Sequence, residues 1–132
     1  MVKPWLTEPN TKDWEAHGLP CALRRGPGGH WCGYVGVSAE HPAHMKEYWD
    51  LDVRIHGGLT YGEPGNGKHL PEGRYWLGFD CAHSGDLCPW YADKGYHSFA
   101  DGEYRDIHYV TAETERLAEQ LAVMVEGQAD AP

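Results

Sequence analysis

The run Arg74–Cys81 constrains the fold most, because large apolar side chains alternate along it with polar or small ones. Side chains of a strand point alternately to opposite faces, so Tyr75, Leu77 and Phe79 fall on one side of an extended chain. We therefore predict a strand with one face in a hydrophobic core. The run Asp52–His56 alternates in the same way, which predicts a second, half-buried strand.

A β-hairpin is predicted ahead of these runs. Two short β-capable segments, Cys21–Arg25 and His30–Val37, flank the turn-forming residues Gly26–Gly29. A cluster of glycine and proline between two such segments is a typical hairpin signal. We also expect a short strand at Tyr104–Val110, close to the C-terminal region.

A cover for the sheet is predicted near the C-terminus. Thr111 is a favourable N-cap, and the acidic residues that follow it suit the first turn of a helix. Five apolar side chains then recur at helical spacing: Leu117, Ala118, Leu121, Met124 and Val125. Gly127 is expected to end this helix. The sequence therefore predicts an α+β fold, an antiparallel sheet of about four to six strands with the helix Thr111–Val125 across one face.

The chain has 132 residues, a length typical of one domain. We expect residues 1–132 to form a single domain, with residues 1–17 as an irregular N-terminal lead-in and residues 126–132 as a C-terminal tail. Residues 38–50 are predicted to form a long connection or one short helix. Residues 84–102 are predicted to form a loop that acts as a lid or wall.

The charge of the chain limits its partners. A formal net charge of −9 argues against a nucleic-acid partner, because no basic stripe is present to replace counterions on phosphates. No run approaches the roughly 18 apolar residues of a membrane span, and the first residues lack the apolar stretch of a signal peptide. We therefore expect a cytoplasmic protein with reduced cysteines and no membrane partner. The oligomeric state is left open, a homo-oligomer included.

The segment Gly62–His69 approaches the pattern of a phosphate-binding loop, with His69 in place of the usual serine or threonine. Such a loop needs a helix that begins at its lysine, so that backbone amides converge on the phosphates. Pro71 and Gly73 follow too closely for that helix to form. We therefore interpret this segment as a plain turn.

The cysteines offer the ligand types of a zinc site without its spacing. Cys81, His83 and Cys88 could act as ligands, but the chain has no pair of cysteines separated by two residues. The favoured interpretation is that buried thiols fill the core. A zinc site and a cysteine nucleophile stay open as less favoured alternatives.

Two segments rich in glycine, histidine and aspartate form the candidate site. They are Ile55–Tyr61 and Gly78–Asp86, and both place polar side chains beside glycines at strand ends. If the two segments lie side by side, five groups converge: His56, Thr60, Asp80, His83 and Asp86. The alternative interpretation is local, with Asp80 capping a turn and His83 bonded to backbone.

Four strings in this chain resemble a family of small proteins encoded by bacteriophages and prophages. They are His30–Val37, His56–Thr60, Gly78–Asp86 and Tyr104–Asp106, and the resemblance extends over most of the chain. It implies residence in the cytoplasm of an infected bacterium. It also suggests, by analogy with other phage proteins, a role in sequestering a nucleotide-derived immune signal.

We favour the hypothesis that the protein binds a small polar ligand and needs no cofactor. Aromatic rings would come from Trp31, Tyr34 and Tyr61. Hydrogen bonds would come from His56, Thr60, Asp80, His83, Asp86 and Arg105.

Two alternatives remain open. The first is a metal-assisted hydrolase, whose ligands and acid or base groups would be His56, Asp80, His83 and Asp86. The second is an acidic inhibitor of a host protein that acts through the aromatic loop Cys88–Phe99. The sequence does not decide between holding a ligand and reacting with it.

Overall fold

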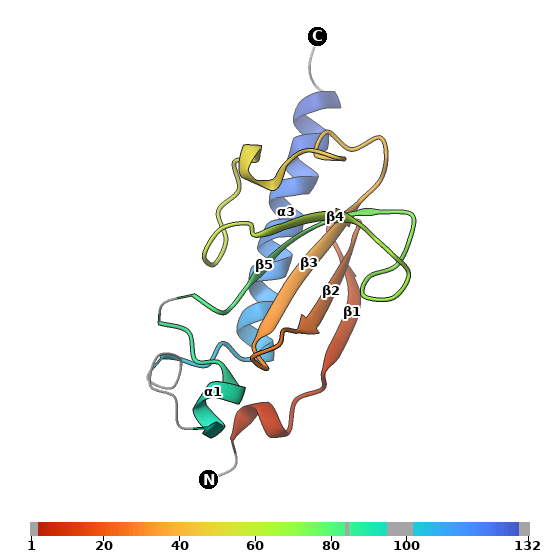
Figure 1. Ribbon diagram of the computed structural model, residues 1–132. Coiled ribbons are helices and arrows are strands. Elements are labelled where there is room, and N and C mark those ends of the chain that lie inside the picture. Colours follow the sequence, from red (N-terminus) through yellow and green to blue (C-terminus); the bar gives the residue numbers. More distant parts are fainter. Residues whose placement is uncertain (1–2, 84, 95–101, 130–132) are drawn as a thin grey trace.

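The core of the fold is a five-stranded sheet with strand order β1-β2-β3-β5-β4, in which every neighbouring pair is antiparallel (Figure 1). The computed structural model describes residues 3–83, 85–94 and 102–129. The strands are β1 (Thr11–Ala16), β2 (Leu19–Arg25), β3 (Trp31–Val37), β4 (Tyr61–Pro64) and β5 (Tyr75–Asp80). The central strand β3 is buried along its whole length.

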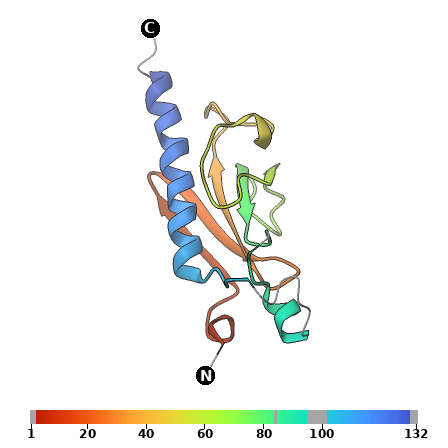
Figure 2. The same ribbon diagram turned by 90° about the vertical axis from the view of Figure 1, so that its left-hand side faces the viewer.

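One long helix, α3 (Ile107–Ala129), covers one face of this sheet. Figure 2 shows the helix and the strands as two layers seen from the side. The short elements are η1 (Pro4–Leu6), η2 (Tyr48–Asp50) and α1 (Pro89–Lys94). The predicted α+β fold with a C-terminal helix on a sheet is confirmed. Among the described helices, none combines the length and the apolar character that crossing a bilayer requires.

The main core lies between α3 and the sheet. Apolar side chains from one face of β2, β3 and β5 pack against the helical stripe, as predicted, except that Val125 is 43% exposed and lies outside the core. The fully buried members include Leu23, Trp31, Val35, Leu77, Phe79, Val110, Leu117 and Leu121. Gly33 allows the close approach of the helix, because a Cβ there would lie 2.3 Å from Thr114 Oγ1. Each buried leucine stabilises the fold by about 1.5 to 3 kcal/mol relative to an exposed one.

The face of the sheet that points away from α3, here called the far face, carries a smaller apolar cluster. Its buried members are Ala22, Cys32, Tyr34, Leu70 and Trp76. Trp76 donates its indole N–H to the carbonyl of Pro71 at 3.0 Å, which ties residues 65–74 to the sheet. The far face is therefore partly covered by a loop.

The N-terminal region differs from the prediction, because β1 occupies part of the expected irregular lead-in 1–17. Trp14 lies on the helix side and donates its indole N–H to Glu115 at 2.9 Å. The neighbouring positions of β1 are polar, and Lys12 also contacts α3, through the hydroxyl of Thr111. A strand with a single large apolar side chain gives too weak an alternation to be recognised from sequence.

The prediction of a strand at Asp52–His56 is wrong. Residues 52–55 have no regular secondary structure, His56 begins a turn, and the segment runs beside α3 outside the five strands. Side chains of α3 form hydrogen bonds with its backbone. Gln120 Oε1 accepts a hydrogen bond from the Arg54 amide at 2.7 Å, and Glu113 Oε1 accepts one from the His56 amide at 2.9 Å. The alternation correctly placed Val53 and Ile55 against the core. It could not reveal that the partner is a helix.

The prediction of a strand at Tyr104–Val110 is also wrong, because α3 begins at Ile107 and not at Thr111. Asp106 Oδ1 accepts the amide N–H of Tyr109 at 2.8 Å, which is the geometry of an N-cap. Glu8 Oε2 accepts the amide of Ile107 at 3.0 Å from far along the chain. The helix also continues past Gly127, to Ala129.

The loop after β4 agrees with the interpretation of Gly62–His69 as a turn. Asn66 Oδ1 accepts hydrogen bonds from the amides of Lys68 and His69, both at 2.8 Å, and no helix follows.

In the predicted lid 84–102, the structure describes α1 and the residues around it. Residues 84 and 95–101 lie outside the described residues, and part of the predicted inhibitory loop Cys88–Phe99 lies there with them.

Removal of one buried side chain from α3 tests this account of the core. Leu121→Ala is expected to lower the free energy of unfolding by about 2 to 5 kcal/mol, because it leaves a cavity against the sheet. Val123 is 55% exposed, so Val123→Ala should change stability by less than about 0.5 kcal/mol. Urea unfolding followed by circular dichroism measures both. Equal effects of the two variants would contradict the assigned packing.

Candidate functional site

Asp86 is a buried carboxylate to which three separate segments bond. Its side chain is 1% exposed. Oδ2 accepts from Nε2 of His56 at 2.8 Å and from the backbone amide of His83 at 3.0 Å. Oδ1 accepts from Nε of Arg105 at 2.9 Å. Asp86 therefore joins the segment before β4, the loop after β5 and the segment just before α3.

These contacts decide the ionisation of Asp86. Burial alone would raise the pKa of this carboxyl, because a low-dielectric environment disfavours the charged form. The hydrogen bonds from His56, Arg105 and the His83 amide act in the opposite direction and prevail, so the pKa lies below its ordinary value. Asp86 is consequently a carboxylate at neutral pH.

His56 is positioned by two residues of α3. Its amide donates to Glu113 Oε1, and its Nδ1 lies 2.8 Å from the hydroxyl of Tyr109. Tyr109 and Glu113 are four positions apart, so both side chains lie on one helix face. The two ring nitrogens of His56 are therefore held between Tyr109 and Asp86.

His83 and Asp80 adjoin this arrangement at the end of β5. Nε2 of His83 lies 3.5 Å from Asp80 Oδ1, and the other oxygen of Asp80 accepts from the Thr60 hydroxyl at 3.3 Å. The imidazole of His83 lies over Gly57, where a Cβ would come within 2.4 Å of the ring. Nδ1 of His83 is buried and has no hydrogen-bond partner among the described residues.

The structure thus brings together the five groups that were expected to converge if the two segments lie side by side. The alternative local interpretation also holds in part, because Asp80 Oδ1 accepts the amide of Ala82 at 3.2 Å. Asp80 caps a turn and contacts His83 at the same time. We call His56, Asp80, His83, Asp86 and Arg105 the His/Asp cluster.

The three aromatic rings expected at this site divide between the main core and the far face of the sheet. Trp31 is fully buried in the main core, with its indole N–H donated to Glu8 and Arg25 stacked on its ring at 3.8 Å. Its expected role as a ring open to a ligand is therefore corrected. Tyr34 and Tyr61 lie on the far face, in edge-to-face contact at 5.1 Å between ring centres.

Sequence reasoning did not assign Tyr109, Glu113 or His30 to the candidate site. Because the sequence predicts a strand at Tyr109, it does not indicate that Tyr109 and Glu113 share one helix face. His30 is 9% exposed, and its Nδ1 has no partner among the described residues. Burial lowers the pKa of His30, while Asp80 and Asp86 oppose that shift through their negative charge.

The cysteines agree with the favoured interpretation of buried thiols. All four are free and buried. Burial raises the pKa of Cys32 to about 12 and that of Cys88 to about 11, so both are protonated at neutral pH. Among the described residues, the group with metal-ligand spacing is His56, His83 and Asp86, which contains no cysteine.

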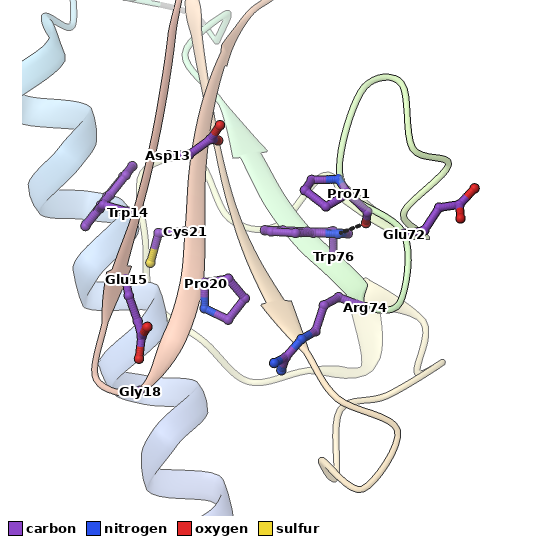
Figure 3. A pocket seen from close by; sticks show the side chains of 10 residues that line it. All are labelled: Asp13, Trp14, Glu15, Gly18, Pro20, Cys21, Pro71, Glu72, Arg74 and Trp76. Carbon is purple, nitrogen blue, oxygen red and sulfur yellow. Dashed lines mark hydrogen bonds between the residues drawn. The ribbon is translucent and has the colours of Figure 1, made fainter.

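A hollow of about 420 Å³ lies apart from the His/Asp cluster, between the strands β1 and β2 and the loop 65–74 (Figure 3). Its lining combines Pro20, Trp76 and Arg74 with acidic side chains. The acidic members are Asp13, Glu15 and Glu72. The hollow and the cluster share no residue.

Replacement of the central carboxylate tests this geometry. Asp86→Asn is expected to lower the free energy of unfolding at neutral pH by about 3 kcal/mol, because Arg105 loses its buried charged partner. The folded-state pKa lies below the ordinary value of 3.8, so this stabilisation is present above that value and is lost as pH falls through the folded pKa. The difference between wild type and variant should therefore shrink in acid. Urea unfolding at several pH values measures this difference in the free energy of unfolding. A difference that does not change with pH would contradict the assignment of Asp86 as a buried, ionised carboxylate.

Comparison of the chain with models of protein families, with curated proteins and with solved structures gives no match. The functional evidence for this chain is therefore the chemistry of the His/Asp cluster.

Proposed function

We propose that the protein binds a small polar ligand at the His/Asp cluster and releases it unchanged. One observation supports this most: partly exposed hydrogen-bonding side chains surround one buried, ionised carboxylate. The side chains of His56, His83, Asp80 and Arg105 are 13%, 28%, 33% and 23% exposed. Polar groups that are fixed by internal contacts and still reach solvent are suited to bind a ligand without reorganisation.

The chemistry of these groups suits a ligand with several oxygen atoms. Arg105 and the imidazole of His83 can donate hydrogen bonds to a ligand, and Asp80 can accept them. Arg105 is fixed by Asp86 and Glu103, so its guanidinium has a defined orientation. A phosphorylated or polyhydroxylated compound would present matching oxygens and hydroxyls.

Tyr61 supports the narrower proposal of a nucleotide-derived ligand. It pairs with Gly78, two residues before Asp80 on the same face of the sheet. Two residues along a strand span about 7 Å, so one molecule of nucleotide size could contact both Asp80 and Tyr61. Sequestration of such a signal in a bacterial cytoplasm would agree with the resemblance to phage-encoded proteins.

Metal-assisted hydrolysis is the alternative function for the same side chains, and the fate of the ligand separates the two. The protein would be mixed with a panel of nucleotides, denatured, and the small molecules identified by mass spectrometry. We expect one nucleotide to be retained in stoichiometric amount and recovered intact. Recovery of a hydrolysed product would establish the alternative, and retention of none would overturn the proposal.

Substitution of Arg105 tests whether the cluster is the binding site. Arg105→Gln is expected to weaken binding of the retained nucleotide by about tenfold or more, because a charge-assisted hydrogen bond is lost. Arg74→Gln, in the separate hollow, is the matched control and should leave the affinity unchanged. Isothermal titration calorimetry measures both affinities, and unfolding midpoints verify that both variants fold. Equal affinities would place the site elsewhere.

A further inference from the structure

We propose that His56, His83 and Asp86 together bind one divalent first-row transition-metal ion. The inference goes beyond the proposed function, because the ion would bind in the absence of any organic ligand. The three residues each offer one ligand atom, and these atoms lie within 4.8 Å of one another. They come from two segments that are well separated in sequence and that Asp86 holds together.

The spacing of the ligand atoms fits an ion of this size. A tetrahedral zinc ion with bonds of about 2.1 Å holds its ligand atoms about 3.4 Å apart. The pair His56 Nε2 and Asp86 Oδ2 is 2.8 Å apart, and no pair in the group exceeds 4.8 Å. The observed range includes the required spacing, so small side-chain movements would complete the site.

Each of the three ligands already has an orienting partner. Ligand residues in metal sites are typically held by a second hydrogen bond on the atom that does not touch the ion. Tyr109 occupies this place on Nδ1 of His56, and Arg105 occupies it on Oδ1 of Asp86. Asp80 faces Nε2 of His83 at 3.5 Å. This assigns the predicted metal residue Asp80 to an orienting role.

One nitrogen of His83 has no partner in the described part of the chain and could act as a metal ligand. Its Nε2 faces Asp80, while its buried Nδ1 has no partner among the described residues. A buried nitrogen without a partner is unfavourable by about 1 to 3 kcal/mol. An ion bound by Nδ1 would satisfy this atom, and the absence of a Cβ at Gly57 gives the imidazole the room that it needs there.

The ligand set indicates the class of metal. Two imidazoles and one carboxylate suit zinc, iron, cobalt or nickel, whereas magnesium and calcium prefer oxygen ligands throughout. Three protein ligands leave at least one coordination position for water or another molecule. The partial exposure of both imidazoles allows such a molecule to reach the ion.

Titration of the metal-free protein tests the inference directly. Protein treated with a chelator and then dialysed would be titrated with Co²⁺, with Zn²⁺, with Fe²⁺ under anaerobic conditions, and with Mg²⁺. We expect one equivalent of Co²⁺ to give the visible absorption of a site with nitrogen and oxygen ligands, and Zn²⁺ to displace it. Competition by Fe²⁺ identifies the preferred ion. Binding of Mg²⁺ alone, or of no ion, would overturn the proposal.

Two histidine variants assign the site. His83→Ala is expected to weaken Co²⁺ binding by at least about tenfold, and it should fold, because the His83 ring makes few hydrogen bonds. His108→Ala removes an exposed histidine of α3 outside the cluster and should leave binding unchanged. Equal Co²⁺ affinity of both variants would contradict the assignment. Metal binding without nucleotide binding would support this inference and overturn the proposed function. Nucleotide binding without metal binding would support the proposed function and overturn this inference.

Discussion

The buried carboxylate of Asp86 is the interaction on which the candidate site depends. A charge with 1% exposure is tolerated only where it is paired and hydrogen-bonded, and Asp86 gains these partners from three parts of the chain. The same contacts fix His56, which has no strand to hold it, and orient the loop that carries His83. The requirement to satisfy one carboxylate thus determines where two imidazoles and a guanidinium lie. The scaffold adds rigidity, because β5 ends at Asp80 and α3 presents Tyr109 and Glu113 from one helix face.

Sequence alone predicts those parts of the fold that depend on local periodicity. The alternation in β5 and the stripe in α3 identify the two main layers of the core, because both patterns reflect burial on one side. Periodicity does not identify the partner of a segment, and for that reason Asp52–His56 was taken for a strand although α3 satisfies its backbone. The start of α3 was misplaced for a similar reason, since the acceptor of the Ile107 amide is Glu8, nearly one hundred residues away.

The candidate site was predictable in its polar residues and not in its aromatic ones. Histidine and aspartate beside glycine at strand ends mark positions where polar groups can gather, and His56, His83 and Asp86 do lie together. The prediction that Trp31 contacts a ligand is wrong, because the sequence does not show whether a large ring faces a ligand or the core. The pairing of Tyr109 with Glu113 on one helix face could be found only once α3 was known to begin at Ile107, four residues before the predicted start.

A single metal ion would unite the binding and hydrolytic hypotheses, because it could anchor a polar ligand or activate a water molecule at the same position. The most direct test is a crystal structure of the protein soaked with Zn²⁺, with diffraction data collected on both sides of the zinc absorption edge. We predict one anomalous peak within bonding distance of His56, His83 and Asp86. A map without a peak there, or with zinc bound by the cysteines instead, would contradict the account.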